Sequence, residues 1–310
     1  MTHTPRPYRD EQDLERMKAL LILGRQAANG TYYVHTGDLD WWLYYLSVQR
    51  EWNEIIFLWD GPCPDGQLSG WALLSPEWRA FDVFVHPQER GSVRAAEMYI
   101  WAEEQIARLV RQGGGKDIQT MWVFEDDIVL VSHLLQQGFV RSEDYMFYFE
   151  RSLGESLPAI SLPAGFQVRS VSDKDDAQKR ARASHAAFGS DKPFDIYLPR
   201  YQRFMSSPAY IPDLDLLSVA PDGCCASFCI CWLDPINQVG LFEPVGSHPD
   251  FQRLGLGKAV MIEGLRRMQA KGMRAAIVGA ESDNPAAQEL YRSIGFQVVN
   301  KLWTYRKKLE

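Results

Sequence analysis

The clearest candidate for binding chemistry is a short glycine-containing loop in the second half of the chain. It follows a predicted strand, opens a predicted helix, and consists of Gln252, Arg253, Leu254, Gly255, Leu256, Gly257 and Lys258. Glycines let the backbone come close to a ligand, and the first N–H groups of a helix have no partner within the helix. Together with the helix dipole and the charges of Arg253 and Lys258, they predict a site for an anion such as a pyrophosphate.

Two common phosphate-binding loops do not fit these residues. A dinucleotide fingerprint would need glycine at Val260. A Walker A loop would need glycine at Gln252 and Ser or Thr at Ala259. Taken alone, the two glycines also fit the corner of an ordinary strand–turn–helix unit, so the surrounding pattern has to decide.

Predicted elements on both sides would position this loop. Val239–Ser247 alternates as a strand, Gly255–Lys271 carries an apolar helical stripe, Arg274–Ala280 is a strand, and Pro285–Ile294 is a helix with Asn284 as N-cap. The other elements predicted in this half are strands at Phe166–Val171, Leu214–Ala220, Cys225–Trp232, Gln297–Val299 and Leu302–Lys308 and helices at Lys174–Phe188 and Phe194–Met205. Strands interleaved with helices predict a mixed α/β sheet layered by helices.

Charge divides the chain into two parts. The 33 Lys and Arg and 40 Asp and Glu residues leave a net charge of −7, of which −10 falls on Met1–Leu157 and +3 on Pro158–Glu310. Residues 151–163 contain two prolines, three serines and a glycine, a composition typical of a linker. We therefore expect two domains, at residues 1–150 and 164–310.

The first half repeats the order of the second half in a degenerate form. Asp127–Phe139 aligns with Asn284–Phe296 at an offset of 157, and Val85–Pro87 aligns with Ser247–Pro249 at an offset of 162. We expect a duplicated fold whose two copies have diverged.

Taken together, these motifs resemble the GNAT superfamily of N-acetyltransferases. The family's Q/R-x-x-G-x-G/A loop and its N-x-x-A-x-x-L-Y-x-x-x-G-F helix are matched almost position for position by Gln252-Arg253-x-Gly255-x-Gly257, Asn284 and Leu290-Tyr291-x-x-Ile294-Gly295-Phe296. The resemblance covers Gly165–Glu310. It implies two tandem GNAT-like folds, the second intact and the first degenerate, each with a mixed, mostly antiparallel sheet whose splayed middle strand is flanked by helices.

The resemblance also implies acetyl-CoA as the acyl-donor substrate, with no metal ion. The donor would lie along the Val239–Ser247 strand, with its pantetheine arm and thioester against Val245, Gly246 and Ser247. A backbone N–H there would stabilise the oxyanion of the tetrahedral intermediate, and the loop would hold the pyrophosphate. Asn284 matches the cofactor-contacting asparagine of the family, although helix N-capping explains it equally well.

Acetyl transfer to an amine needs an acid and a base, and the resemblance makes Tyr291 the acid. A phenol with a pKa of about 10 is matched to a departing thiolate of pKa roughly 8.5, and the alternative is a packing role. Glu243 is the candidate base, since it shares a strand face with Val245 and Ser247 if alternation holds, whereas a β-bulge would reverse that parity. Glu281 is the reserve candidate, and an amine of lowered pKa would need no protein base.

The first copy departs from this pattern at the residues that matter. Val93 stands opposite Gly255, Leu134 stands opposite Tyr291, and Glu89 adds a negative charge to the loop. We expect this copy to keep the fold without its own catalysis, to complete the acceptor site, and to attract a cationic amine with its acidic surface.

Clustered cysteines invite a zinc interpretation that their spacing does not favour. On a strand, Cys225, Cys229 and Cys231 would share one face with Ser227, a straight-chain arrangement that does not surround a tetrahedral ion. We expect them, with Cys224, to act as small apolar or surface residues rather than as ligands.

Two histidines and an aromatic stretch are interpreted as structural. His248 is expected to be a loop residue, and His185 a helix residue near the acceptor side. Tyr32–Trp52 is rich in Trp and Tyr but has Arg50 as its one basic residue, which disfavours nucleic-acid binding and favours core or interdomain surface.

We therefore expect an acetyl-CoA-dependent N-acetyltransferase acting on a primary amine of a small molecule by direct attack in a ternary complex. The alternatives are a protein N-terminal or lysine acetyltransferase and a non-catalytic acyl-CoA-binding regulatory module. Acidic residues ahead of Leu20–Leu23, the absence of any run of about 18 apolar residues and the clustered, odd-numbered cysteines predict a cytoplasmic protein without a membrane partner. The acceptor, the acyl chain length and a homodimer are left open.

Overall fold

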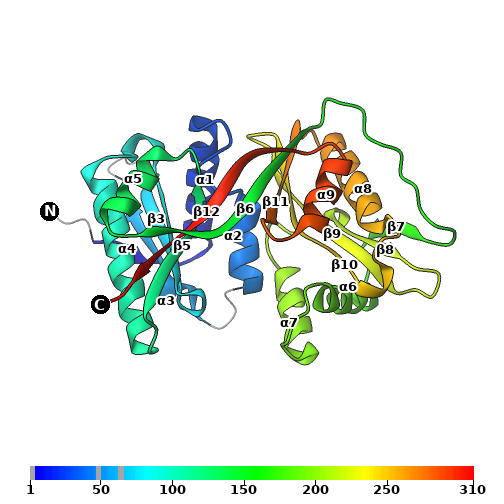
Figure 1. Ribbon diagram of the computed structural model, residues 1–310, viewed down its shortest axis with the longest axis horizontal. Coiled ribbons are helices and arrows are strands. Elements are labelled where there is room, and N and C mark those ends of the chain that lie inside the picture. The colour runs from blue at the N-terminus through cyan, green and yellow to red at the C-terminus, as the bar shows by residue number, and fades with distance from the viewer. Residues whose placement is uncertain (1–3, 47–49, 62–65) are drawn as a thin grey trace. The chain divides into compact units, whose positions relative to one another are not determined.

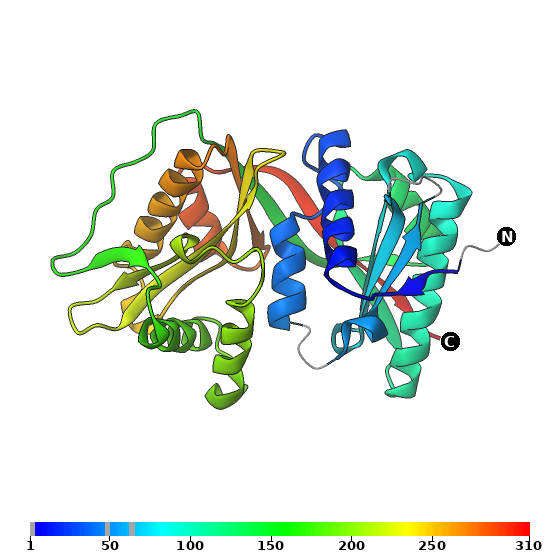
Figure 2. The ribbon, with the colours of Figure 1, turned by 180° about the vertical axis from the view of Figure 1, so that it is seen from behind.

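The computed structural model describes residues 4–46, 50–61 and 66–310, and Figure 1 and Figure 2 show its ribbon from two opposite sides. No helix in these described ranges is long and apolar enough to cross a lipid bilayer.

The chain divides into two compact units that are not continuous in sequence. Unit 1 contains Met1–His35, Gln49–Phe147 and Asn300–Glu310, and unit 2 contains Thr36–Val48 and Tyr148–Val299. The main division at residue 147 lies close to the expected end of the first domain at residue 150. A segment of the N-terminal half nevertheless belongs to unit 2, and the last residues belong to unit 1.

Unit 1 is a mixed sheet flanked by helices. Its elements are strands β1 (Arg6–Pro7), β2 (Ile56–Asp60), β3 (Leu68–Ser75), β4 (Ala80–Val85), β5 (Asp117–Phe124) and the start of β6 (Val140–Ser152), and helices α1 (Glu11–Ala27), α3 (Trp52–Ile55), α4 (Val93–Gln112) and α5 (Ile128–Gln136). The strand order is β1-β2-β3-β4-β5, followed by the end of β12 (Gln297–Lys308). Helix α4 packs against β3, β4 and β5.

Unit 2 has the same kind of architecture. Its elements are helix α2 (Thr36–Trp41), the end of β6, strands β7 (Gln167–Ser170), β8 (Asp215–Val219), β9 (Cys225–Asp234), β10 (Val239–Ser247) and β11 (Ala275–Glu281), and helices α6 (Lys174–Ala187), α7 (Phe194–Phe204), α8 (Leu256–Ala270) and α9 (Pro285–Ser293). The strand order is β7-β8-β9-β10-β11-β6. These bounds agree with the predicted elements to within a few residues.

Alternation along β9 sends neighbouring side chains to helices on opposite faces of the sheet. The guanidinium of Arg180 on α6 lies 3.7 Å from the ring centroid of Phe228. On the other face, the Cys229 thiol lies 3.6 Å from the carbonyl oxygen of Val260 on α8. Helices α6 and α8 therefore sandwich the strands that lead to the candidate site.

One pair of strands in each unit runs parallel, in sheets that are otherwise mostly antiparallel. In unit 2, β10 pairs with β11 from Val239 to Phe242, but continues to Ser247 along β9. In unit 1, β4 and β5 form the corresponding parallel pair at Ala80 and Gln119. The middle strand of each sheet thus separates from one neighbour, which confirms the predicted fold class and the duplication.

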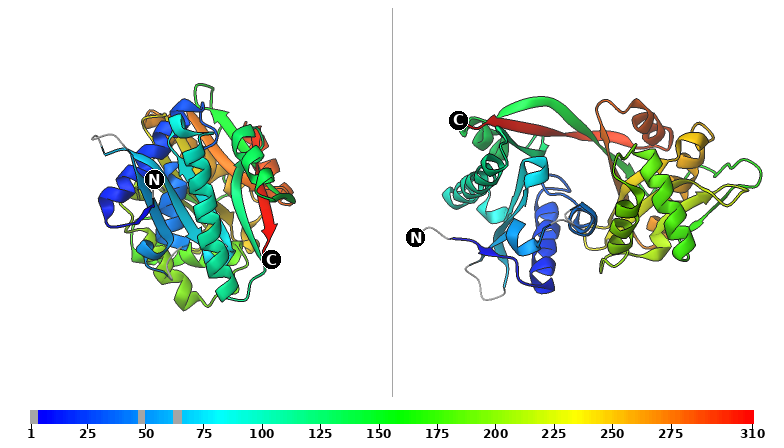
Figure 3. Two further views of the ribbon diagram at one scale, coloured as in Figure 1. Left: turned by 90° about the vertical axis from the view of Figure 1, so that its left-hand side faces the viewer. Right: turned by 90° about the horizontal axis from the view of Figure 1, so that it is seen from below.

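Two details of the predicted strands were wrong. Gln297–Val299 and Leu302–Lys308 belong to one strand, β12 (red in Figure 3), which continues from Gln297 to Lys308 and pairs with β5 from Leu302 onward. The cysteines of β9 do not all share a face with Ser227, because a register shift between β8 and β9 at Val219 interrupts the alternation. Cys225 lies within electrostatic reach of Arg180 on α6, whereas Cys229 and Cys231 face α8.

The aromatic stretch in the N-terminal half forms part of the core of unit 2. Trp41 in α2 stacks on Tyr45 at 3.9 Å between ring centroids and meets Phe204 of α7 edge-on at 5.1 Å. Ser207 donates a hydrogen bond of 2.9 Å to the carboxylate of Asp40, next to Trp41. This segment therefore supports unit 2, and residues 47–49 of the predicted stretch lie outside the described residues.

Candidate active site

The site begins where β10 turns away from β11. The register between β10 and β9 shifts between Phe242 and Val245, so that Glu243 and Pro244 form a bulge. The indole N–H of Trp232 donates a 2.7 Å hydrogen bond to the carbonyl oxygen of Glu243 and fixes the bulge in place. The pairing of β10 with β11 ends at Phe242, whereas the pairing of β10 with β9 continues to Ser247. The backbone of β10 from Val245 onward therefore lies at an opening between β10 and β11.

The bulge changes which side chains share a face of β10. Phe242 and Val245 lie opposite Cys231 and Cys229, two residues of β9 that point the same way. The simple alternation that would place Glu243 on the face of Val245 and Ser247 is therefore interrupted at Glu243 itself. The structure therefore contains the β-bulge that would reverse the face of Glu243 relative to Val245 and Ser247.

The packing leaves no room for a side chain at Gly246 and little room at Gly257. A Cβ at Gly246 would overlap the ring of Phe228. A Cβ at Gly257 would lie 3.2 Å from the hydroxyl oxygen of Ser247 and 3.5 Å from Leu290. The N-terminus of α8 is thus close to the end of β10 and to α9.

The first turn of α8 lacks a side-chain cap. Its N-cap residue is Gly255, in the left-handed conformation with φ of 77°, and Arg253 before it also has a positive φ of 65°. Since glycine has no side chain to accept a hydrogen bond, the first N–H groups of α8 remain available to an anion. The ammonium of Lys258 donates to the carbonyl oxygen of Ser293 at 3.1 Å, which ties it to the end of α9.

Tyr291 and Glu243 are electrostatically coupled. Tyr291 lies on α9, is 5% exposed, and packs edge-on against Phe149 with 5.6 Å between ring centroids. Burial, and next the charge of Glu243, raise the pKa of Tyr291 above its usual value. Among the described residues its hydroxyl has no hydrogen-bond partner, so this group can serve a ligand.

Two further carboxylates influence Glu243 at the bulge. Removal from water raises the pKa of Glu243 to about 8, and the charges of Asp38 and Glu281 add to that rise. Glu281, the alternative candidate for the base, is the last residue of β11, and Asp38 lies in α2. A Cβ at Gly37 would overlap the Trp232 ring, so α2 packs directly on the residue that holds the bulge.

Sequence reasoning missed Asp38. It lies 205 positions before Glu243, and no local pattern links the two. The Trp- and Tyr-rich composition of the surrounding stretch indicated that the stretch is buried, but it did not indicate which elements it packs against.

Other predicted residues have structural partners. The side-chain oxygen of Asn284 accepts from the Ala287 N–H at 3.1 Å, which is the N-capping role. His248 accepts from the Asp250 N–H at 3.3 Å and starts the turn before the loop, as expected of a loop residue. The His185 ring lies 2.7 Å from the carbonyl oxygen of Lys192.

In the first copy, the helix start that corresponds to the anion loop is capped, and the position of Tyr291 is taken by a buried leucine. Ser92 is the N-cap of α4 and its hydroxyl accepts from the Ala95 N–H at 3.1 Å. Helix α4 begins at Val93 with Ser92 as its N-cap, whereas α8 begins at Leu256 with Gly255 as its N-cap. Leu134 is 1% exposed and belongs to the core.

In the described residues, no group of three or more His, Cys, Asp or Glu side chains is arranged to hold a metal ion. The arrangement in unit 2 consists instead of an opening strand edge, an uncapped helix N-terminus, a buried phenol and three carboxylates.

Sequence comparisons match this arrangement to an enzyme family. The Acetyltransferase (GNAT) family profile matches residues 181–296. A mycothiol acetyltransferase from Kineococcus radiotolerans is 29% identical over 242 residues, 75% of each chain. Another mycothiol acetyltransferase, from Amycolatopsis mediterranei, is 24% identical over 301 residues, 93% of each chain.

Solved structures share the fold over nearly the whole length. A tandem GNAT protein from the clavulanic acid biosynthesis pathway has a TM-score of 0.69 at 14% identity and covers 98% of this chain and 97% of its own. A GCN5-related N-acetyltransferase from Sphaerobacter thermophilus has a TM-score of 0.66 at 19% identity, with 98% and 95% covered. Residues 181–296 thus match the acetyltransferase (GNAT) family, and the chain as a whole shares its fold with solved proteins that are named as members of that family, one of them a tandem GNAT protein.

Proposed function

We propose that unit 2 transfers the acetyl group of acetyl-CoA to a primary amine of a small molecule. The observation that carries this proposal is the coupling of the buried Tyr291 hydroxyl to Glu243, at the point where β10 leaves β11. A proton donor and a proton acceptor stand together there, beside a helix N-terminus suited to a pyrophosphate.

The donor would lie along β10 and end at α8. Its pyrophosphate accepts hydrogen bonds from the N–H groups at the uncapped start of α8, in the loop Gln252–Lys258. Its pantetheine arm follows Val245, Gly246 and Ser247, whose outer edge β11 has left. A backbone N–H of this segment stabilises the oxyanion as the thioester carbonyl becomes tetrahedral.

The chemistry is a direct attack of amine on thioester. Glu243 takes a proton from the incoming ammonium, directly or through a water, and the amine nitrogen forms a bond to the carbonyl carbon. The carbon–sulfur bond then breaks, and the departing thiolate takes the proton of Tyr291. The attacking nitrogen loses its second proton as the amide forms, and the Tyr291 phenolate takes up a proton again, which its raised pKa favours.

The carboxylates favour a cationic acceptor. Asp38 and Glu281, and Glu243 once it is ionised, place negative charge where the ammonium would arrive. Relatives named mycothiol acetyltransferase support a small-molecule acceptor over a protein one. A protein N-terminus or lysine is the competing acceptor, and an acyl-CoA-binding module without catalysis is the competing function.

Release of the CoA thiol on mixing with acetyl-CoA and a panel of amines tests the proposal. We expect amine-dependent release of one thiol for each amide formed. Acetyl-CoA binding without thiol release for any amine or peptide acceptor would support the binding module, and release with peptides alone would support a protein acetyltransferase.

A further inference from the structure

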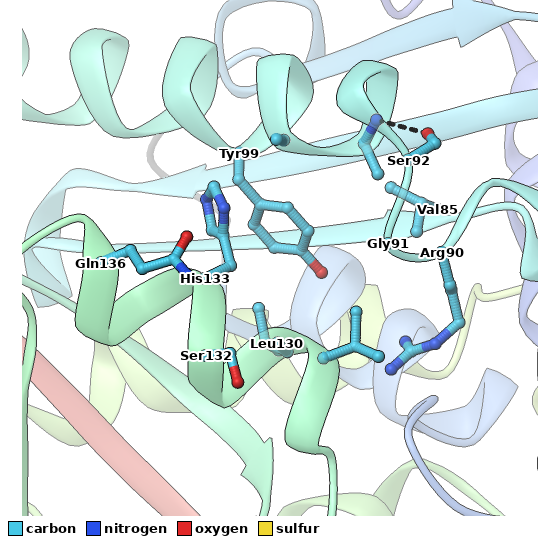
Figure 4. A pocket seen from close by; sticks show the side chains of 12 residues that line it. Val85, Arg90, Gly91, Ser92, Tyr99, Leu130, Ser132, His133 and Gln136 are labelled. Atoms are coloured by element: carbon cyan, nitrogen blue, oxygen red, sulfur yellow. Dashed lines mark hydrogen bonds between the residues drawn. The ribbon is translucent and has the colours of Figure 1, made fainter.

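Unit 1 contains a cavity that the proposed chemistry does not use. Its volume is about 320 Å³, and it lies between the start of α4, helix α5 and the end of β4 (Figure 4). Cavities of this size are typical of small-molecule sites. In the duplicated fold it takes the place that the anion loop and α9 have in unit 2.

Three groups that could bind an anion at this cavity already have partners within the protein: the Ala95 N–H, the Leu130 N–H and the Arg90 guanidinium. The Ser92 hydroxyl occupies the Ala95 N–H at the first turn of α4. The guanidinium of Arg90 forms an ion pair with Asp127, which also caps α5 by accepting from the Leu130 N–H at 3.1 Å. An anion would therefore have to displace a carboxylate or a cap, which leaves the cavity without a built anion site.

The walls of the cavity are apolar and aromatic. Aliphatic side chains come from β4, α4 and α5: Val85, Ala95, Ala96, Val129 and Leu130. The rings of Tyr99 and His133 form the remaining wall, 5.2 Å apart between centroids with 43° between their planes, and Figure 4 shows them extending from α4 and α5 toward each other. Such a wall suits the face or edge of an aromatic ring.

Both ring side chains are uncharged at neutral pH. The Tyr99 hydroxyl donates to the Val83 carbonyl oxygen at 3.1 Å, and burial raises the pKa of Tyr99. Burial lowers the pKa of His133, so the imidazole is neutral. The imidazole and the exposed side chains of Ser132 and Gln136 supply the hydrogen-bonding groups of the lining on the α5 side.

Apolar residues next in sequence to the lining are unusually exposed. Val93 is 79% exposed beside Ser92, and Ile128 is 75% exposed beside Val129. Val129, which lines the cavity, is itself 48% exposed, so part of the apolar lining is open to solvent.

We propose that unit 1 binds an uncharged aromatic small molecule in this cavity, with the ring between Tyr99 and the aliphatic wall and a polar substituent directed toward His133. This gives the degenerate copy a binding role distinct from acetyl transfer in unit 2. It needs no part of the proposed chemistry to be correct.

Titration of the full-length protein with N-phenyl-1-naphthylamine, an uncharged aromatic probe whose fluorescence rises in apolar sites, tests this inference. We expect saturable binding of one probe per chain. Ala96→Phe fills the cavity from α4 and should weaken binding by about tenfold or more. Glu104→Phe adds the same ring to an exposed position of the same helix outside the cavity lining and should leave binding unchanged.

A second variant keeps the test decisive if Ala96→Phe does not fold. Ser132→Trp fills the cavity from the exposed face of α5 and should weaken binding to the same degree. Absence of saturable binding, or binding equal in the filled variants and in Glu104→Phe, would overturn the proposal. Displacement of the probe by excess CoA would overturn the uncharged ligand class, whereas acetyl transfer measured alongside should be unaffected by the probe.

Discussion

Burial and neighbouring negative charge raise the pKa values of both Tyr291 and Glu243, and the chemistry expected of the two residues depends on these shifts. Each pKa is raised, so the phenol holds its proton and the carboxyl releases its proton only in mildly basic solution. The sequence indicated both residues through the family motif and the strand pattern. It could not indicate the direction of the shifts, because both arise first from burial in the folded protein, and because Glu243 is also affected by Asp38 on a distant segment.

Replacing Tyr291 with phenylalanine should lower kcat by about 100-fold or more, the usual effect of losing a general acid. The KM for acetyl-CoA should change little, since the ring and its packing on Phe149 remain. Tyr197→Phe is a matched control, because Tyr197 is buried in the same unit and bonded to Ser184 at 2.9 Å. Equal kinetics for the two variants, measured by thiol release, would exclude Tyr291 as the acid.

The rate should depend on pH through Glu243. A carboxyl with a pKa of about 8 is protonated below that pH and ionised above it, and only the ionised form accepts a proton, so kcat/KM should rise as pH increases through about 8. Glu243→Gln should remove this rising limb from the pH–rate profile. A profile in Glu243→Gln that keeps the limb would assign it to another group.

Asp38 should tune the same profile. Its negative charge helps to raise the pKa of Glu243, so Asp38→Asn should lower that pKa and shift the rising limb to lower pH. Asp40→Asn is the control in the same helix, because Asp40 accepts a hydrogen bond from Ser207 and is not among the charges that raise the pKa of Glu243. A limb that stays in place in Asp38→Asn would show that α2 does not act on the base.

At the scale of elements, the two copies differ most in how one helix begins. Helix α8 starts at a glycine without a side-chain cap, and α4 starts at Ser92 with one. The sequence predicted α8, its loop and its neighbours to within a few residues, since glycines and apolar periodicity are local signals. It did not predict the register of the bulge at Glu243 or the true start of α4, because both depend on pairing and packing with other elements.

Gly257→Val should therefore raise the KM for acetyl-CoA. A branched side chain at this position would meet the Ser247 hydroxyl and Leu290 and would move the start of α8 away from the end of β10, so the affinity for CoA should fall by about tenfold or more. Isothermal titration with CoA measures it directly. An unchanged affinity would show that the start of α8 does not touch the donor.

Ser92→Ala in unit 1 should affect the stability of the protein but not its activity. Loss of the cap should lower the free energy of unfolding by about 1 kcal/mol, while acetyl transfer stays the same. Chemical denaturation and thiol release measure the two effects. A loss of activity without a loss of stability would give α4 a part in the reaction.

At the scale of the whole molecule, neither unit is a continuous piece of the chain. Unit 2 takes α2 from the N-terminal half, and unit 1 takes the end of β12. The charge step near residue 157 lies about ten residues from the main division at residue 147, and composition cannot reveal that a segment of one half belongs to the other unit. The carboxylate of Asp38 and the packing of Trp41 on Phe204 reach unit 2 only through this exchange.

A fragment of residues 158–310 should consequently fail to form an active unit. It lacks α2 and the part of β6 that belongs to unit 2, so Phe204 and Trp232 would lose apolar neighbours. Thermal unfolding and thiol release of the fragment measure the loss. Normal stability and activity would show that unit 2 does not depend on the N-terminal segment.

A crystal structure of the full-length protein with CoA tests the central claim most directly. The account predicts that the pyrophosphate contacts the backbone N–H groups at the start of α8, and that the pantetheine arm runs along Val245–Ser247 to end near Tyr291. CoA bound in unit 1 with the α8 site of unit 2 empty, or a thiol end remote from Tyr291, would contradict it.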